Sequence, residues 1–106
     1  MARYILNSPV LTDYGVYQYT QLTLDQARAW VRQGPFESAV GHEPTARFLS
    51  RLLGVTVLAR RVAVKMQPGD EALVFRVLGR LPEGRVLSET ELPLVPHEFG
   101  LLRRFS

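Results

Sequence analysis

Alternating apolar and polar positions predict strands in several parts of the chain. Residues 3–7 alternate and contain tyrosine and isoleucine, and residues 15–21 alternate valine and tyrosine with polar side chains. A period of two is typical of strands with one covered face. Residues 71–78 form the most apolar run of the chain and predict a central strand.

Two stretches show the three-to-four-residue apolar spacing of amphipathic helices. The first opens with a capping box made by Thr23 and Gln26 and ends before the glycine-proline pair at 34–35. The second begins near Pro44, which suits a first helical turn, and ends at Gly54. The apolar side of this second helix consists of Phe48, Leu49, Leu52 and Leu53.

The remaining segments complete a prediction of the fold class. Residues 37–40 predict a short strand, and residues 55–66 are long, β-branched and extended, which predicts a further strand. Residues 88–91 can open a short final helix, whereas the proline-rich tail 93–106 receives no element. We therefore expect residues 1–106 to form one small α/β domain, with a mixed sheet of about five strands flanked by helices.

Composition restricts the possible chemistry. The 106 residues are 46% hydrophobic, which allows a packed core, and a domain this small would gain from dimerisation. The chain has no cysteine and two histidines, so disulfides and cysteine zinc sites are excluded and no short-spaced metal-ligand cluster appears. We expect no cofactor and no metal. No apolar run approaches the roughly 18–20 residues of a membrane span, so we expect a cytoplasmic protein without a membrane partner.

The net charge is +3, and almost all of the basic residues are arginines, Lys65 being the only lysine. This excess is too small to predict a long nucleic-acid track. Arginine binds phosphate through a flat, two-pronged donor that keeps its charge. A GC-rich genome or a thermophilic source would also explain the preference for arginine.

A candidate anion site lies at the start of the second predicted helix, in the sequence Gly41-His42-Glu43-Pro44-Thr45. Backbone N–H groups at a helix start lack partners inside the helix, and the helix dipole favours an anion there. Gly41 allows a close approach of the backbone, and Thr45 adds a hydroxyl donor. The structural alternative is that His42 or Glu43 only caps the helix.

Three other polar features have structural alternatives as well. The pair Arg60-Arg61 begins an alternating stretch, where arginines often are simply solvated. Arg80 and Glu83 stand three residues apart, as in a local ion pair. His97 lies alone near the C-terminus, which is more typical of a surface histidine than of a ligand. Taken alone, these residues predict only a small α/β domain with a phosphate site at the second helix.

Several blocks of sequence, in a constant order, are similar to a known family. These blocks are residues 39–45 and the helix up to residue 54, residues 61–66, residues 69–73 and residues 80–87. In them the chain resembles the small archaeal-virus proteins that act as type III anti-CRISPR ring nucleases, a family with relatives in bacteria, phages and CRISPR loci. The resemblance extends over roughly residues 36–92, with a weaker similarity at residues 6–8.

The resemblance implies a two-fold homodimer with a ring of cyclic tetra-adenylate (cA4) bound between its subunits. The catalytic histidine of a Gly-His-x-x-Thr motif falls on His42, and a catalytic pair falls on Arg80 and Glu83. Ligand-binding positions fall on Arg61 and Asn7, beside those at Gly41, Glu43 and Thr45. The implied activity is metal-independent cleavage of cA4 to linear di-adenylate with a 2′,3′-cyclic phosphate, which switches off type III CRISPR signalling.

The chain departs from the family pattern at three places. Glu43-Pro44 stands where other members have Asp-Ser, Gly79 where a glutamine is common, and Pro82-Glu83 where two glutamates occur. The first two departures affect ring contacts, and the third keeps Glu83. Two alternative functions are a protein that sequesters the cyclic nucleotide without cleaving it and a small viral nucleic-acid-binding module. Acidic residues mixed among the basic ones argue against the second alternative.

Overall fold

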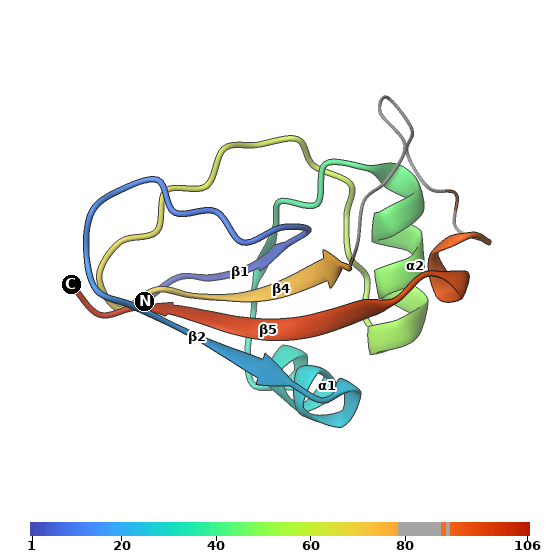
Figure 1. Cartoon of the computed structure of the whole chain (residues 1–106), viewed down its shortest axis with the longest axis horizontal. Coiled ribbons are helices and arrows are strands. Elements are labelled where there is room, and N and C mark those ends of the chain that lie inside the picture. The colour runs from blue at the N-terminus through green and yellow to red at the C-terminus, as the bar shows by residue number, and fades with distance from the viewer. Residues whose placement is uncertain (79–87, 89) are drawn as a thin grey trace.

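The computed structural model describes residues 1–78, 88 and 90–106. Its elements, in chain order, are β1 (Arg3–Leu6), β2 (Tyr17–Leu22), α1 (Leu24–Arg32), β3 (Glu37–Ser38), α2 (Glu43–Leu53), β4 (Glu71–Val77), the 3-10 helix η1 (Leu92–Leu94) and β5 (His97–Arg104). The described strands form one five-stranded mixed sheet in the order β2-β5-β4-β1-β3 (Figure 1). Strand β1 runs parallel to β3 and β4, while β5 is antiparallel to β4 and β2. This sheet with its helices confirms the predicted fold class.

Both predicted helices form where their local signals placed them. At the start of α1 the Thr23 hydroxyl accepts from the Gln26 backbone N–H at 3.1 Å, and the Gln26 side chain accepts from the Thr23 N–H at 2.9 Å. Helix α2 has Pro44 in its first turn and is followed by Gly54, whose φ of 74° lies in the left-handed region that glycine adopts without strain. Local capping chemistry therefore determines these ends.

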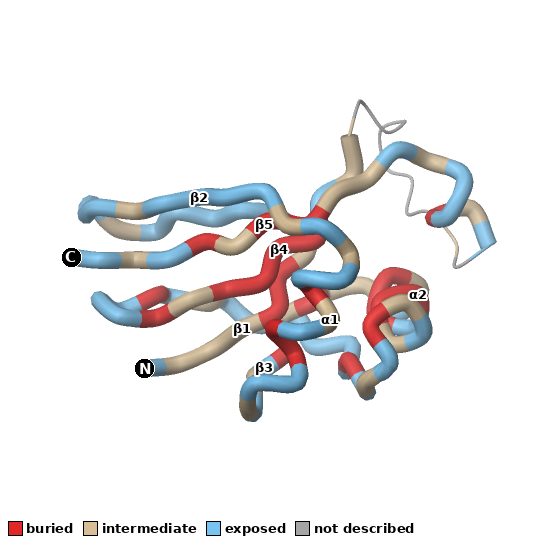
Figure 2. Tube along the Cα trace, turned by 90° about the horizontal axis from the view of Figure 1, so that it is seen from below, coloured by how far each residue is buried: buried red, intermediate tan, exposed pale blue. Residues whose placement is uncertain are grey.

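The sheet packs on both of its faces. On one face, Leu73 and Phe75 of β4 contact the apolar sides of α1 and α2. On the other face, Val74 of β4 packs with Leu6 and with Met66 from the connection that precedes β4. Strand β4 is accordingly buried over most of its length, whereas the edge strand β2 is largely exposed (Figure 2). The prediction of a central strand at residues 71–78 is confirmed.

The expectation of a long strand at residues 55–66 is wrong. The segment is irregular, and its backbone pairing with the described part of the chain is limited to an isolated parallel bridge between Val40 and Ala59. β3, the outermost strand on that side of the sheet, has only two residues, so it offers the segment too short an edge for a long strand to pair with. Apolar side chains of the segment cover a sheet face instead, and Val64 and Met66 pack over it.

The C-terminal tail, which received no predicted element, provides the strand β5 between β2 and β4. Phe99 and Leu102 of this strand are buried. The Tyr19 ring of β2 lies against Gly100, where an added Cβ would come within 2.4 Å of the ring. The helix expected from residue 88 is only the short 3-10 turn η1. Across the described ranges, no helix has the length and apolar character needed to cross a membrane.

Candidate functional site

The candidate site lies where β1 and β3 end. These neighbouring strands are parallel, so the chain leaves both at the same end of the sheet, at Asn7 after β1 and at Ala39 after β3. Ligands of open α/β sheets bind at the carboxyl ends of such strands. A hollow of about 190 Å³ is found here, and Asn7, Ala39 and Val62 are among the residues that line it.

The chain that follows β3 leads directly into α2. His42 is the N-cap residue and has extended backbone angles, φ −126° and ψ 126°, but its side chain makes no capping hydrogen bond. Its carbonyl accepts the Ala46 N–H at 3.0 Å, which starts the helix. The half-buried imidazole is thus not used to satisfy the first turn, and the simple capping role considered for His42 is not what its side chain performs.

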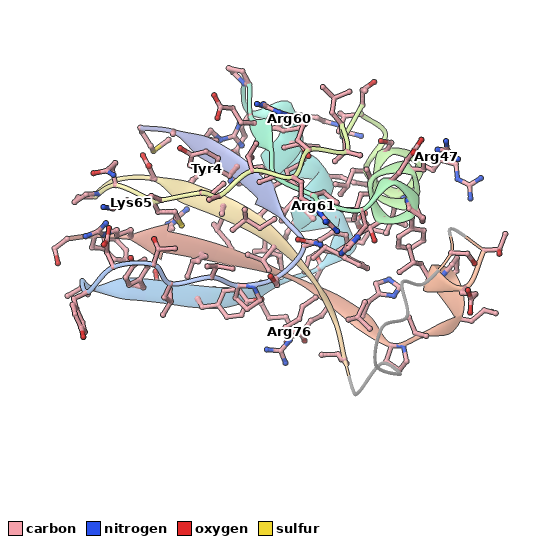
Figure 3. The ribbon with its side chains drawn as sticks, turned by 90° about the horizontal axis from the view of Figure 1, so that it is seen from above. Tyr4, Arg47, Arg60, Arg61, Lys65 and Arg76 are labelled. Atoms are coloured by element: carbon pink, nitrogen blue, oxygen red, sulfur yellow. The ribbon has the colours of Figure 1, made fainter. Side chains whose placement is uncertain are left out.

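Arg61 lies against Gly41, the residue before His42. A Cβ placed on Gly41 would stand 3.3 Å from Arg61 Cγ and 3.7 Å from its Nε. That distance is tighter than an ordinary contact, so glycine is what lets the arginine approach the start of α2. Figure 3 shows Arg60 and Arg61 on opposite sides of their segment, with Arg61 on the side toward α2.

The charges around Arg61 leave its guanidinium available. Arg61 is exposed, and within the part of the chain that the structure describes no carboxylate forms an ion pair with it. Glu43, the nearest acid in sequence to Gly41, is paired with Arg47 one turn further along α2. An arginine without an acidic partner beside a helix N-terminus provides a place for a phosphate.

The other sequence-predicted site residues have mixed positions. Thr45 is in the first turn of α2 and only 7% exposed, whereas Glu43 is exposed. The catalytic pair assigned by resemblance, Arg80 and Glu83, lies outside the described residues. Leu78, after which that segment begins, directly follows β4. Because β4 is parallel to β1, the chain leaves β4 at the same end of the sheet as Asn7.

His97, whose sequence context favoured a surface histidine over a ligand, is half-buried. Its ring lies 5.6 Å from that of Phe48 and 5.4 Å from that of Phe75, measured between centroids. Its Nδ1 is 3.0 Å from the Val95 carbonyl oxygen. The residue therefore belongs to the aromatic contacts that join α2 to β4 and β5. An apolar neighbourhood distant in sequence produces this placement, so the local pattern gave no sign of it.

The acidic and histidine residues do not gather into a metal site in the described ranges, where no three His, Cys, Asp or Glu side chains come together. The site that the structure does assemble is a backbone and guanidinium surface: Gly41, the uncapped start of α2, and Arg61, with His42 beside them. Such a surface suits a phosphate or phosphodiester.

This fold defines a class of small α/β proteins in which a helix without a side-chain cap begins next to the ends of parallel strands. The chain belongs to the STIV B116-like family, whose model matches residues 3–99. It is 34% identical over 101 residues to "Uncharacterized protein YddF" of Bacillus subtilis (strain 168), covering 93% of this chain and 94% of that protein.

Archaeal virus proteins are similar to it as well. "Uncharacterized protein ORF117" of Acidianus two-tailed virus is 32% identical over 107 residues, covering 95% of this chain and 92% of that one. The solved structure of B116 of Sulfolobus turreted icosahedral virus superposes with a TM-score of 0.76 at 23% identity, covering 98% of this chain and all of that chain. This likeness shows the fold, and the relatives place the chain in a family with viral and bacterial members.

Proposed function

We propose that this protein is a ring nuclease, a homodimer that binds cyclic tetra-adenylate and cleaves it without a metal ion. The observation that carries the proposal is the contact of Arg61 with Gly41 beside the uncapped start of α2, next to His42. The family membership and the resemblance of the motif blocks to viral ring nucleases support the same substrate.

A phosphodiester of the ring would bind at the start of α2. The helix dipole and the unpaired N–H groups of the first turn favour an anion there. The Arg61 guanidinium supplies a charge-assisted donor from the other side. Because the Arg61 side chain lies where a Cβ of Gly41 would stand, the phosphate would meet the guanidinium and the first-turn N–H groups together. The hollow next to Asn7 would receive part of an attached nucleotide.

The reaction needs no external nucleophile. The 2′-hydroxyl of one nucleotide attacks the adjacent phosphorus in line, the new P–O2′ bond forms, and the P–O5′ bond breaks. The departing 5′-oxygen requires a proton, which the imidazolium of His42 donates, while the proton of the 2′-hydroxyl passes to solvent or to a nearby base. Arg61 and the backbone N–H groups stabilise charge on the five-coordinate phosphorane. Arg80 is assigned to the same charge, and Glu83 to orienting Arg80 or the 2′-hydroxyl.

The symmetry of the ring supports a dimer. Four equal nucleotides match a two-fold axis, which would bring one His42 to each of two opposite phosphates. Cleavage at both phosphates releases two linear di-adenylates, each ending in a 2′,3′-cyclic phosphate. In a cell this reaction would remove the second messenger of a type III CRISPR response.

The decisive experiment incubates the purified protein with cyclic tri-, tetra- and hexa-adenylate, with and without EDTA, and identifies the products by mass. We expect cA4 to be cut to the 2′,3′-cyclic-phosphate dimer at equal rates with and without chelator. Activity that EDTA abolishes and Mg²⁺ or Mn²⁺ restores would refute the metal-free mechanism. Binding of cA4 without any product would favour sequestration instead, and neither binding nor cleavage would refute the proposal.

Two further measurements test its components. Light scattering should give the mass of a dimer at micromolar concentration, and a fully active monomer would contradict the two-fold arrangement. Single-turnover cleavage should slow in Arg80→Ala and, less strongly, in Glu83→Ala. Wild-type rates in both variants would remove this pair from the reaction.

A further inference from the structure

Ser38, the last residue of β3, is only 6% exposed and its hydroxyl has two partners. The Oγ donates to the Leu58 carbonyl at 2.6 Å and accepts from the Val40 N–H at 3.3 Å. Leu58 is twenty residues away in sequence, on the irregular segment that precedes β4. A buried hydroxyl with both a donor and an acceptor role is a fixed point between two stretches of chain.

The two stretches joined by Ser38 are those that form the candidate site. Three residues beyond Ser38 the chain reaches Gly41, and three residues beyond Leu58 it reaches Arg61. Between these points the Arg60 N–H donates to the Val40 carbonyl at 2.8 Å. The hydroxyl and this backbone bond therefore set how the Arg61 side chain is placed on Gly41.

The segment needs such fixing because it has no strand partner. Among the described residues, its one backbone bridge is the Val40–Ala59 pair. A second serine acts one residue earlier: Ser50 of α2 accepts from the Val57 N–H at 2.8 Å. Hydrogen bonds thus hold the segment to α2 at Val57 and to β3 at Leu58. Three residues further along, the Arg61 side chain is exposed and forms no ion pair with the described residues.

We propose that Ser38 is a positioning residue, which holds the Arg61 segment against the end of β3 so that the guanidinium and the start of α2 face the same phosphate. The inference rests on the proposed function for its ligand, and on the hydrogen bonds alone for its geometry. Ser38 itself does not touch the ring. Its contribution to affinity passes through Arg61.

A double-mutant cycle tests this route. The affinity for cA4 is measured in a His42→Ala background, so that the ring stays intact, for Ser38→Ala, Arg61→Ala and the double variant. Loss of one buried hydrogen bond corresponds to roughly a 2- to 10-fold effect. We expect that weakening when Arg61 is present and almost none when Arg61 is already alanine, because coupled residues are not additive.

A matched control separates positioning from general loss of stability. Thr23→Ala removes the cap of α1, far from Arg61 in the chain, and should lower the melting temperature without changing the affinity. If Ser38→Ala weakens binding equally with and without Arg61, or no more than Thr23→Ala does, the positioning role is overturned.

A second experiment tests the positioning role of Ser38 without any ligand. Amide hydrogen exchange at Arg60, whose N–H bonds to Val40, should be faster in Ser38→Ala than in the unsubstituted protein, and unchanged in Thr23→Ala. Unchanged exchange at Arg60 in Ser38→Ala would overturn the structural part of the inference. If the unsubstituted protein fails to bind cA4, the proposed function fails, while the Arg60 exchange still decides whether Ser38 fixes the segment.

Discussion

The two helices of this protein begin in opposite ways. At α1, Thr23 and Gln26 satisfy each other's backbone N–H groups in a closed capping box. At α2, the N-cap residue is His42, whose side chain makes no such bond, and Pro44 follows in the first turn. Both helices are amphipathic, and both pack on the same face of the sheet.

The difference indicates what each helix start is for. A Ser, Thr, Asp or Asn cap stabilises a helix by about 0.5–2 kcal/mol relative to alanine. Helix α2 forgoes that stabilisation at the place where Arg61 approaches Gly41 and where two parallel strands end. A local rule of helix stability that is broken beside an arginine with no described acidic partner is typical of a functional site.

The largest expected effect is on the rate of cleavage, when His42 at the start of α2 is replaced. His42→Ala should slow single-turnover cleavage of cA4 by about 10²–10⁴-fold, the usual contribution of positioned proton transfer. Affinity should change little, because Arg61 and the backbone hold the phosphate. Thr23→Ala, which alters the other helix start, should cleave at the unaltered rate.

A modified substrate sharpens this prediction. When sulfur replaces the leaving 5′-oxygen, the thiolate departs without needing a proton, so a general acid becomes unnecessary. His42→Ala should then cleave the sulfur-substituted ring nearly as fast as the unsubstituted protein does. A defect of equal size on both substrates would exclude His42 as the proton donor, and loss of binding would make it a ligand contact.

Next in size is the effect of the arginine beside α2. Arg61→Ala should weaken cA4 binding by about 1.5–3 kcal/mol, the usual value of a hydrogen bond to a charged group, which is roughly 10- to 150-fold in Kd. Arg60→Ala removes an equal charge from the opposite side of the same segment and serves as the control. Similar losses in both variants would mean that only net charge matters, and would contradict a site built on Gly41.

The sequence predicted the parts of this picture that depend on local chemistry. The capping box of α1, the Gly54 end of α2 and the apolar strand β4 are each encoded by neighbouring residues. The tail strand β5 and the irregular 55–66 segment were missed or wrong because sheet pairing is decided between distant residues. Val62, Val64 and Met66 alternate like a strand, yet the neighbouring outer strand β3 has only two residues with which such a strand could pair.

The residues of the candidate site also differ in whether local sequence or distant contacts reveal them. Gly41 and His42 could be proposed from their position before an amphipathic helix. Arg61 was assigned only through resemblance, because its contact with Gly41 joins residues twenty positions apart. Ser38 escaped notice altogether, since one serine at the end of a short strand has no distinctive pattern. The role proposed for it rests on its hydrogen bonds to Leu58 and Val40.

A smaller effect is expected from His42→Ser, which should raise the stability of the protein while it abolishes cleavage. His42→Ser supplies α2 with the cap that α1 already has, so the free energy of unfolding should rise by about 1 kcal/mol. The same variant should lose cleavage, because serine cannot donate a proton as imidazolium does. Thr23→Ala should lower the free energy of unfolding by a similar amount. Urea denaturation measures both, and a destabilised His42→Ser would show that the imidazole supports the fold.

The smallest expected effect concerns Glu43, which follows His42 and is paired with Arg47 across one turn of α2. Both side chains are 64% exposed, so the pair contributes only about 0.2–0.5 kcal/mol. The Glu43 carboxylate also stands in the first turn of α2, where the helix dipole favours a negative charge. Glu43→Gln should therefore lower stability by less than about 1 kcal/mol. It should also strengthen cA4 binding slightly, because a carboxylate beside a phosphate site repels the ligand.

This gain should fade as salt rises from low to physiological concentration, since exposed charges are screened over about 8–10 Å. Asp25→Asn makes the same change of charge in the first turn of α1, where no phosphate is proposed to bind, and should leave the affinity for cA4 unchanged at every salt concentration. Weaker binding by Glu43→Gln would show that the carboxylate contacts the ring, as the ligand-binding assignment of Glu43 from its motif predicts. Tighter, salt-dependent binding would instead make Glu43 a partner of Arg47 that only lowers the positive field at the start of α2.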